Sequence, residues 1–169
     1  MRRLAKFPLP VATALVVALC ASAVAFAHPT GDHHNGSGKQ GGKAHSGVGK
    51  IVVIEHATSD ATTDTGGPGD TVGDVLTFAN DLFDAADTTK VGTDQGYCIR
   101  VVAGTSYECT WTAFLPGGQL VVSGPFYDAK DSTLAITGGT GIYKRARGTM
   151  DLHALAGGTK FAFTYRVTR

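Results

Sequence analysis

The sequence lacks an excess of charge of either sign. Its 169 residues include 15 Lys and Arg against 14 Asp and Glu, and only 17% of the chain is charged. Neither a strongly basic nucleic-acid binder nor a disordered chain fits this composition. Helix-forming residues are sparse after residue 50, which argues against a helical bundle. The chain instead has 23 glycines and 43% apolar residues, which favours one small all-β domain of short strands and tight turns.

Several catalytic motifs are also missing. The chain contains no HExxH, no GxSxG, no phosphate-binding loop and no paired-cysteine motif with metal spacing. Hydrolase, nucleotide-binding and zinc functions therefore lack support, and we expect neither a metal nor a cofactor. His56 and His153 stand alone in predicted strands, where surface or hydrogen-bonded histidines are commoner than catalytic bases.

The N-terminus reads as a signal peptide. Arg2, Arg3 and Lys6 precede an apolar run at residues 11–24, and Ala25 and Ala27 are the small residues that signal peptidase requires. The run is about 14 residues long, shorter than the roughly 20 of a spanning helix. We therefore predict cleavage after Ala27, secretion, and no membrane segment in the mature protein. The mature chain carries 12 basic and 14 acidic residues, so it has no excess of positive charge that would favour binding to nucleic acid.

A glycine-rich linker follows at residues 28–50. It contains Gly, Ser, His and Lys and almost no apolar side chains, so we expect disorder. Four histidines, His28, His33, His34 and His45, are the right residue type for weak metal chelation. A solvated tether is the interpretation we favour, because ligands on a glycine chain make a poor site.

Residues 51–169 alternate apolar runs with turn residues. The last run is the clearest, since Phe161, Phe163, Tyr165 and Val167 fall on one face. Eight antiparallel strands predict a closed β-barrel with a hydrophobic cavity, and a two-sheet sandwich is the alternative. Only residues 81–89 are expected to hold a helical turn. The eight runs are residues 51–57, 72–78, 97–102, 108–115, 119–123, 133–137, 146–155 and 160–168.

Two polar residues interrupt apolar strand faces. Glu55 shares a face with Ile51 and Val53, and Asn80 shares one with Phe78. A polar residue on such a face marks either a ligand site or a satisfied structural hydrogen bond. The residues alone leave both interpretations open.

The two cysteines outside the signal peptide fit a hairpin. With a turn centred on Ala103 and Gly104, Cys98 and Cys109 stand directly opposite on adjacent strands. Outside the cytoplasm this pairing favours a cross-strand disulfide. The alternative is two free thiols, one of which points into the barrel.

Four segments resemble a known superfamily. Residues 73–84 and 91–98, GDVLTFANDLFD and VGTDQGYC, resemble the GDLxPFxNKLYDG and IGxxxGxC of plant allene oxide cyclases. Residues 123–126 (SGPF) and 134–143 (LAITGGTGIY) resemble that family's QGPY and LAxTGGxGIF, and YKRARG at 143–148 is similar to the GGTGxFRxARG of the related dirigent proteins. The resemblance covers residues 51–169. It implies an eight-stranded barrel with a hydrophobic cavity that assembles as a homotrimer.

The resemblance also implies a function. Allene oxide cyclases steer ring closure of an unstable fatty-acid epoxide, and dirigent proteins steer the coupling of phenoxy radicals. Stereocontrol of a hydrophobic small molecule without a cofactor is thus one expectation. A lipocalin-like carrier of an apolar ligand is the other. The resemblance implies two catalytic residues, Glu55 and Asn80, and five ligand-binding ones: Phe78, Cys98, Phe126, Tyr143 and Arg147.

The match is incomplete at two positions. The cyclases have an asparagine two residues after the glutamate, where this chain has Ala57, and Phe126 lacks the hydroxyl of their tyrosine. Arg147 is either a cavity cation or a strand residue that faces water.

Overall fold

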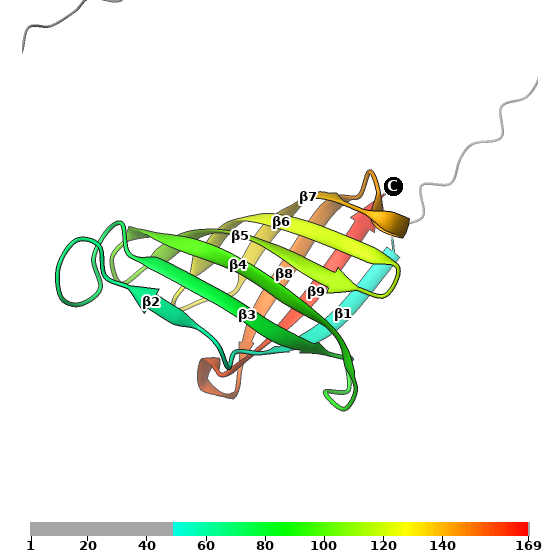
Figure 1. Ribbon diagram of the computed structural model, residues 1–169, viewed down its shortest axis with the longest axis horizontal. Coiled ribbons are helices and arrows are strands. Elements are labelled where there is room, and N and C mark those ends of the chain that lie inside the picture. The colour runs from blue at the N-terminus through cyan, green and yellow to red at the C-terminus, as the bar shows by residue number, and fades with distance from the viewer. Residues whose placement is uncertain (1–48, 169) are drawn as a thin grey trace, which may run out of the picture. The chain divides into compact units, whose positions relative to one another are not determined.

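A computed structural model describes residues 49–168 (Figure 1). The predicted signal peptide, residues 1–27, and residues 28–48 of the predicted linker lie outside the described residues. In the described part the strands are β1 (Gly49–His56), β2 (Ala61–Thr63), β3 (Val75–Phe83), β4 (Lys90–Val102), β5 (Ser106–Leu115), β6 (Gly118–Tyr127), β7 (Ser132–Gly139), β8 (Arg147–Leu155) and β9 (Lys160–Thr168). Two short 3₁₀ helices, η1 (Gly141–Tyr143) and η2 (Ala156–Gly158), complete it.

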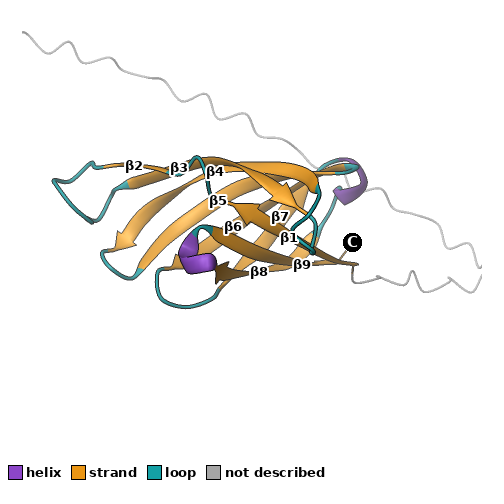
Figure 2. Ribbon diagram, turned by 90° about the horizontal axis from the view of Figure 1, so that it is seen from below, coloured by secondary structure: helices purple, strands orange, loops and turns teal. Residues whose placement is uncertain are grey.

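The strands form one antiparallel sheet that closes on itself. Their order is β1-β9-β8-β7-β6-β5-β4-β3-β2, and β1 also pairs with β3. Eight strands therefore make a closed barrel, which confirms the predicted fold and rules out the sandwich. The ninth strand, β2, pairs only with β3. Figure 2 shows that the two short helices lie in connections between strands. Within residues 49–168 no helix has the length and hydropathy needed to cross a bilayer.

The closure of the barrel is uneven. Strand β1 pairs with β9 from Gly49 to His56, along its whole length. With β3 it pairs only from Ile54 to His56, opposite Phe83 to Asp81. We call this short β1–β3 pairing the seam.

Several sequence expectations differ from the structure. The runs predicted at residues 72–78 and 97–102 are strands at residues 75–83 and 90–102. The barrel begins at Gly49, two residues before the predicted boundary. Residues 81–89 hold no helical turn: residues 81–83 continue β3, and the carboxylate of Asp84 accepts hydrogen bonds from the backbone of Thr88 and Thr89 to fix a loop. Strand β2 was not predicted, because three exposed residues show no alternation.

Alternating side chains fill most of the interior. Phe163, Tyr165 and Val167 of β9 are at most 2% exposed, as the alternation predicts. Leu120 and Met150 are completely buried with them. Space remains at the end of the barrel where β1, β6 and β8 end and β3, β5 and β9 begin.

Candidate functional site

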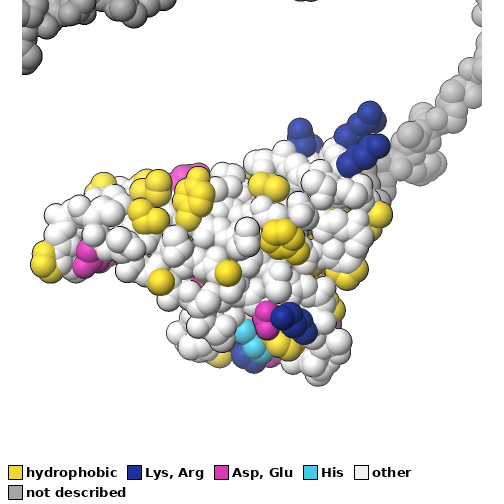
Figure 3. Space-filling view, viewed as in Figure 1, with side chains coloured by type: hydrophobic (Ala, Val, Ile, Leu, Met, Phe, Trp, Pro, Cys, Tyr) yellow, Lys and Arg dark blue, Asp and Glu magenta, His cyan; other side chains and the backbone are white. Residues whose placement is uncertain are grey.

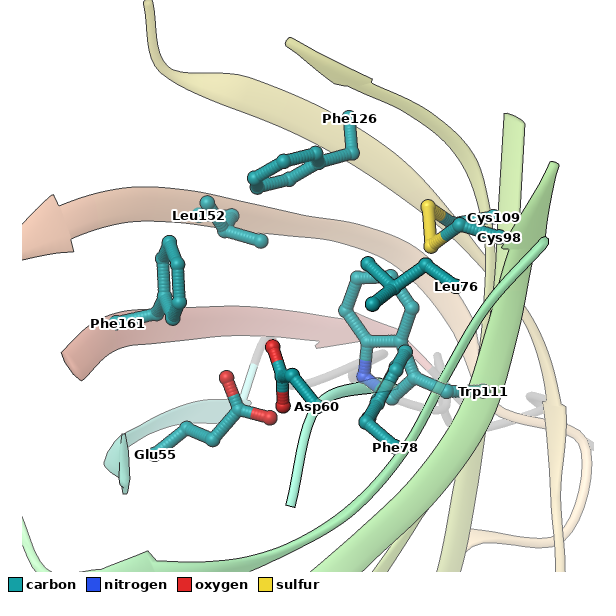
Figure 4. Close-up of a pocket in the computed structure, with 10 residues that line it drawn as sticks. All are labelled: Glu55, Asp60, Leu76, Phe78, Cys98, Cys109, Trp111, Phe126, Leu152 and Phe161. Atoms are coloured by element: carbon teal, nitrogen blue, oxygen red, sulfur yellow. A yellow bond between two sulfur atoms is a disulfide. The ribbon is translucent and has the colours of Figure 1, made fainter. Parts of the chain in front are cut away.

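That end of the barrel holds an apolar pocket of about 40 Å³ (Figure 4). Glu55 and Asp60 are the only charged groups in its lining as described, and their carboxyl groups lie on the same side of the hollow. A space of this size takes only two or three water-sized groups. The rest of the wall is apolar: Leu76, Phe78, Cys98, Cys109, Trp111, Phe126, Leu152 and Phe161.

A second hollow lies outside the first. It measures about 470 Å³ and shares Phe126, Leu152 and Phe161 with the inner pocket. The rings of Phe126 and Phe161 stand edge to face with centroids 5.9 Å apart, and both side chains are half-buried. These two rings therefore stand between the inner pocket and the outer hollow.

A disulfide forms part of the pocket wall. Cys98 and Cys109 are directly opposed in the β4–β5 register, with Cα atoms 4.0 Å apart, and they are bonded. The predicted cross-strand pairing is confirmed and the alternative of two free thiols is wrong. Cys98 thus reaches the pocket as a disulfide sulfur.

Glu55 is a buried carboxyl beside an apolar cavity. It lies at the end of β1, where strand alternation places it on the interior face with Val53, and it is 5% exposed. Burial raises the pKa of Glu55 to about 7, against a hydrogen bond from Asn80 that lowers it, while the charge of Asp60 raises it. Both protonation states are therefore populated near neutrality, which suits a proton donor and acceptor.

The Asn80 side chain organises this region. Its Nδ2 donates to Oε1 of Glu55 at 3.0 Å and to Oδ1 of Asp60 at 2.7 Å. Its Oδ1 accepts from the backbone N–H groups of Thr58 and Ser59, each at 3.0 Å. Asn80 is 2% exposed and does not line the pocket. It holds the loop after β1 and orients the carboxyl groups of Glu55 and Asp60. The catalytic role predicted for Asn80 stays a prediction.

Sequence reasoning missed Asp94. It pairs with Asn80 in the β3–β4 register and is 1% exposed. Its carboxyl group interacts with the carboxyl group of Glu55 and with the backbone of Asn80. Burial, and next the charge of nearby Glu55, raise the pKa of Asp94 to about 9. The available signal was its even spacing from Cys98, which places both on the interior face.

Two further buried polar atoms lie near these carboxyls. The indole Nε1 of Trp111 and the hydroxyl of Tyr165 are both buried, and the two side chains interact with each other. Burial raises the pKa of Tyr165, and the charges of Asp94 and Glu55 raise it further. Trp111 fits here because Gly96 has no side chain: a Cβ at Gly96 would lie 2.3 Å from that of Trp111. Buried polar groups that meet in this way at the wall of a pocket are candidates for a functional site.

The structure brings some predicted site residues together and separates others. Phe78, Cys98 and Phe126 line the pocket with Glu55. Tyr143 is buried, but its hydroxyl donates to the carbonyl of Pro116 at 3.3 Å and it does not line this pocket. Arg147 is exposed at the start of β8, the opposite end of the barrel, and donates to the carbonyl of Ala146. Neither reaches Glu55, because η1 and the start of β8 lie at the far rim.

The two isolated histidines are hydrogen-bonded. Nε2 of His56 lies 2.5 Å from Asp87, which also pairs with Nζ of Lys160 at 2.5 Å. His153 pairs with Asp131 at 2.7 Å on the surface. Both therefore have structural partners outside the pocket. No cluster of three metal-ligating side chains occurs in the described residues.

The sequence profile of the allene oxide cyclase family matches residues 51–168. This chain belongs to the allene oxide cyclase family. The matched residues include Glu55 and Asn80.

Solved structures share this fold. A pyocyanin demethylase is 27% identical, with a TM-score of 0.60 over 69% of this chain and 98% of its own. A pterocarpan synthase dirigent protein is 16% identical, with a TM-score of 0.63 over 81% of this chain and 97% of its own. An exo-specific intermolecular Diels-Alderase is 12% identical, with a TM-score of 0.60 over 73% and 99%. The last two bear on the fold alone.

Proposed function

We propose that this barrel binds a hydrophobic small molecule and steers its cyclisation or a closely related rearrangement, with Glu55 as the proton-transfer group. One observation carries the proposal: the buried carboxyl group of Glu55, with its pKa raised to about 7, lines an otherwise apolar pocket beside Asp60. A general acid or base works best when its pKa lies near the working pH.

The remaining groups support this role. The aromatic walls restrict the conformations of a bound molecule, which favours one mode of ring closure. Asn80 fixes the orientation of the Glu55 carboxyl through the 3.0 Å hydrogen bond. Glu55 gives a proton to one atom of the ligand and takes one back from another. The protein ends as it began, so a rearrangement of this kind balances without a consumed co-reactant.

The test starts from the ligand. Native mass spectrometry of the secreted protein, purified from its own culture medium, identifies any compound that co-purifies. Turnover of that compound is then compared between the wild type, Glu55→Gln and Glu108→Gln. The chain has only these two glutamates, and Glu108 is exposed on β5, so it is a matched control.

We expect Glu55→Gln to lower turnover about 100-fold or more while it leaves ligand binding nearly unchanged. Glu108→Gln should behave as the wild type. Equal turnover in Glu55→Gln and the wild type contradicts the proposed role of Glu55. Binding without turnover in the wild type identifies the lipocalin-like carrier instead.

We also propose that the protein acts outside the cytoplasm and assembles as a homotrimer. The Cys98–Cys109 disulfide supports secretion, since such bonds persist in oxidising compartments. Apolar side chains are exposed on the face formed by β3, β4 and β5 (Figure 3). Tyr97, Ile99 and Val101 alternate along β4 and are 42–49% exposed. An apolar strip of this kind is suited to contact between protomers.

A further inference from the structure

Four basic side chains share the end of the barrel opposite the pocket. Lys50 lies at the start of β1 and Arg147 at the start of β8, and both strand starts pair with Val167 of β9. Lys144 and Arg145 lie in the turn between η1 and β8. All four side chains are exposed. Figure 3 shows Lys and Arg side chains together at the upper right, at this end of the barrel.

The positive charge at this end is not compensated by ion pairs. None of the four side chains has a carboxylate partner within residues 49–168, where the ion pairs of Lys and Arg belong to other bases. Those pairs are Lys90 with Asp81, Arg100 with Asp70 and Asp128, Lys160 with Asp87, and Arg166 with Asp151. The barrel therefore has a strongly basic end, although the formal net charge of the whole chain is only +1.

An exposed isoleucine stands beside these cations. Ile142 is the middle residue of η1, two positions before Lys144, and it is 55% exposed. Its position is fixed, because its N–H donates to the carbonyl of Gly117 at 2.9 Å and the neighbouring Tyr143 is buried. A rigid segment thus holds a large apolar side chain in solvent next to basic ones. This is the combination by which peripheral proteins contact a lipid bilayer.

The isoleucine distinguishes between possible anionic partners. Lys and Arg side chains are attracted to phosphate groups of any source, including nucleic acid and polyphosphate. Such water-soluble polymers offer an aliphatic side chain no apolar environment, so they leave Ile142 exposed. The surface of a bilayer that contains anionic lipid offers both phosphate groups for the cations and an acyl-chain boundary for the isoleucine.

We propose that Lys50, Ile142, Lys144, Arg145 and Arg147 form a basic rim that docks the barrel on membranes rich in anionic phospholipid. This binding is peripheral and needs no spanning segment. It is independent of the chemistry proposed for the pocket. The pocket lies where β1 and β8 end and the basic rim where they begin, so docking leaves the pocket facing the solution.

Co-sedimentation of the secreted protein with vesicles tests the inference. Binding to vesicles of phosphatidylcholine alone is compared with binding to vesicles that contain about 40% phosphatidylglycerol. Each measurement is made at about 0.1 M and about 1 M salt, because screening weakens attraction between exposed charges. Polyphosphate is titrated separately as a soluble polyanion without an apolar phase.

The variants separate the charge of the rim from the charge of the chain. Lys144→Gln combined with Arg145→Asn removes two cations, and Asn suits position 145 because φ there is 69°. Ile142→Ala removes the apolar group and leaves the charge. Lys90→Gln combined with Lys130→Gln is the matched control, because it removes the same charge from two exposed positions off the rim. Lys130 lines the outer hollow, at the pocket end.

We expect the wild type to bind the anionic vesicles at least about tenfold more tightly than the phosphatidylcholine vesicles, and the higher salt to remove most of this difference. The Lys144→Gln, Arg145→Asn variant should bind roughly 25-fold more weakly, since each basic residue near an anionic surface contributes a factor of about five. Ile142→Ala should weaken vesicle binding about three- to tenfold. The control variant should remain within about twofold of the wild type.

Three outcomes overturn the inference. Equal binding of the wild type to the two kinds of vesicle would show that anionic lipid is not recognised. An equal loss of binding in the rim variant and the control variant would assign the effect to net charge. If Ile142→Ala binds vesicles as the wild type does, and polyphosphate binds the wild type as tightly as the anionic vesicles do, the partner is a soluble polyanion and not a membrane.

Discussion

Asn80 joins the two strands that close the barrel: its Nδ2 on β3 donates to Oε1 of Glu55 on β1 at 3.0 Å. The strands that carry these residues pair with each other only over Ile54–His56. The candidate site thus lies on the seam. The same hydrogen bond helps to close the fold and orients the carboxyl group proposed for chemistry.

Replacement of Asn80 by alanine tests how much this junction stabilises the fold. Asn80→Ala removes the partners of Glu55, Asp60 and two backbone N–H groups. We expect the free energy of unfolding to fall by about 2–4 kcal/mol, since buried groups lose their hydrogen bonds. Urea unfolding gives the value. Gln95→Ala, on the exposed face of β4, is the control and should change stability by less than about 0.5 kcal/mol. Equal midpoints for the two variants would refute a stabilising role.

The buried carboxyl pair predicts a stability that falls as pH rises. The pKa values of Glu55 and Asp94 are raised to about 7 and about 9, so the folded state holds protons that the unfolded chain releases near pH 4. Their contribution is full below about pH 4 and is lost as pH rises to about 9. Asp74 and Asp151 have lowered pKa values, and their opposite effect acts at acid pH.

Urea unfolding at about pH 6 and about pH 9 measures this loss, which we expect to be on the order of a few kcal/mol. Asp94→Asn should remove much of it, because an amide does not ionise. Asp64→Asn changes an exposed carboxyl and should leave the pH dependence as in the wild type. A wild-type stability that is equal at the two pH values contradicts the raised pKa of both groups.

The Cys98–Cys109 bond should stabilise the barrel moderately. It closes a loop with a sequence separation of 11. The chain-entropy relation gives roughly 3 kcal/mol for a loop of this size. We expect the free energy of unfolding of the Cys98→Ala, Cys109→Ala double variant, measured by urea unfolding, to be lower by about that amount. Intact mass of the secreted protein should increase by about 2 Da on reduction. Labelling of both thiols without a reductant would show that the bond is absent in solution.

The apolar strip on β4 makes the proposed trimer testable. Light scattering of the wild-type protein should give about three times the protomer mass. Ile99→Asp places a charge in the strip without touching the interior and should yield monomers with an unchanged circular dichroism spectrum. Ala135→Asp, exposed on β7, is the control and should remain trimeric. A monomeric wild type at all concentrations removes the trimer proposal.

Local patterns predicted the fold and part of the site. The alternation of Phe163, Tyr165 and Val167 identified an interior face, and the symmetric placement of Cys98 and Cys109 about a turn identified the disulfide. Both depend on neighbours in the sequence or across one hairpin. Glu55 was recognisable for the same reason, as a polar residue on an apolar face.

The sequence alone could not predict which strands, far apart in the chain, lie side by side in the closed barrel. Asp94 approaches Glu55 because β3 lies between β4 and β1 in the closed barrel, with Asn80 opposite Asp94. That arrangement follows from the register of the seam, which no local pattern encodes. Tyr143 and Arg147 lie at the far rim for the same reason. Their segment resembles the family's motif, but the position of a motif along a strand decides which end of the barrel it reaches.

The seam also has a mechanical consequence. Strand β1 pairs with β3 over three residues and with β9 over eight. A closed barrel with one short pairing is expected to open at that pairing first. Local opening costs least where the fewest backbone hydrogen bonds must break. Glu55 and Asn80 lie at the seam, so local opening begins beside the residues of the proposed ligand site. The amides of Ile54 and His56 should then exchange with solvent sooner than those in the middle of β5 and β6.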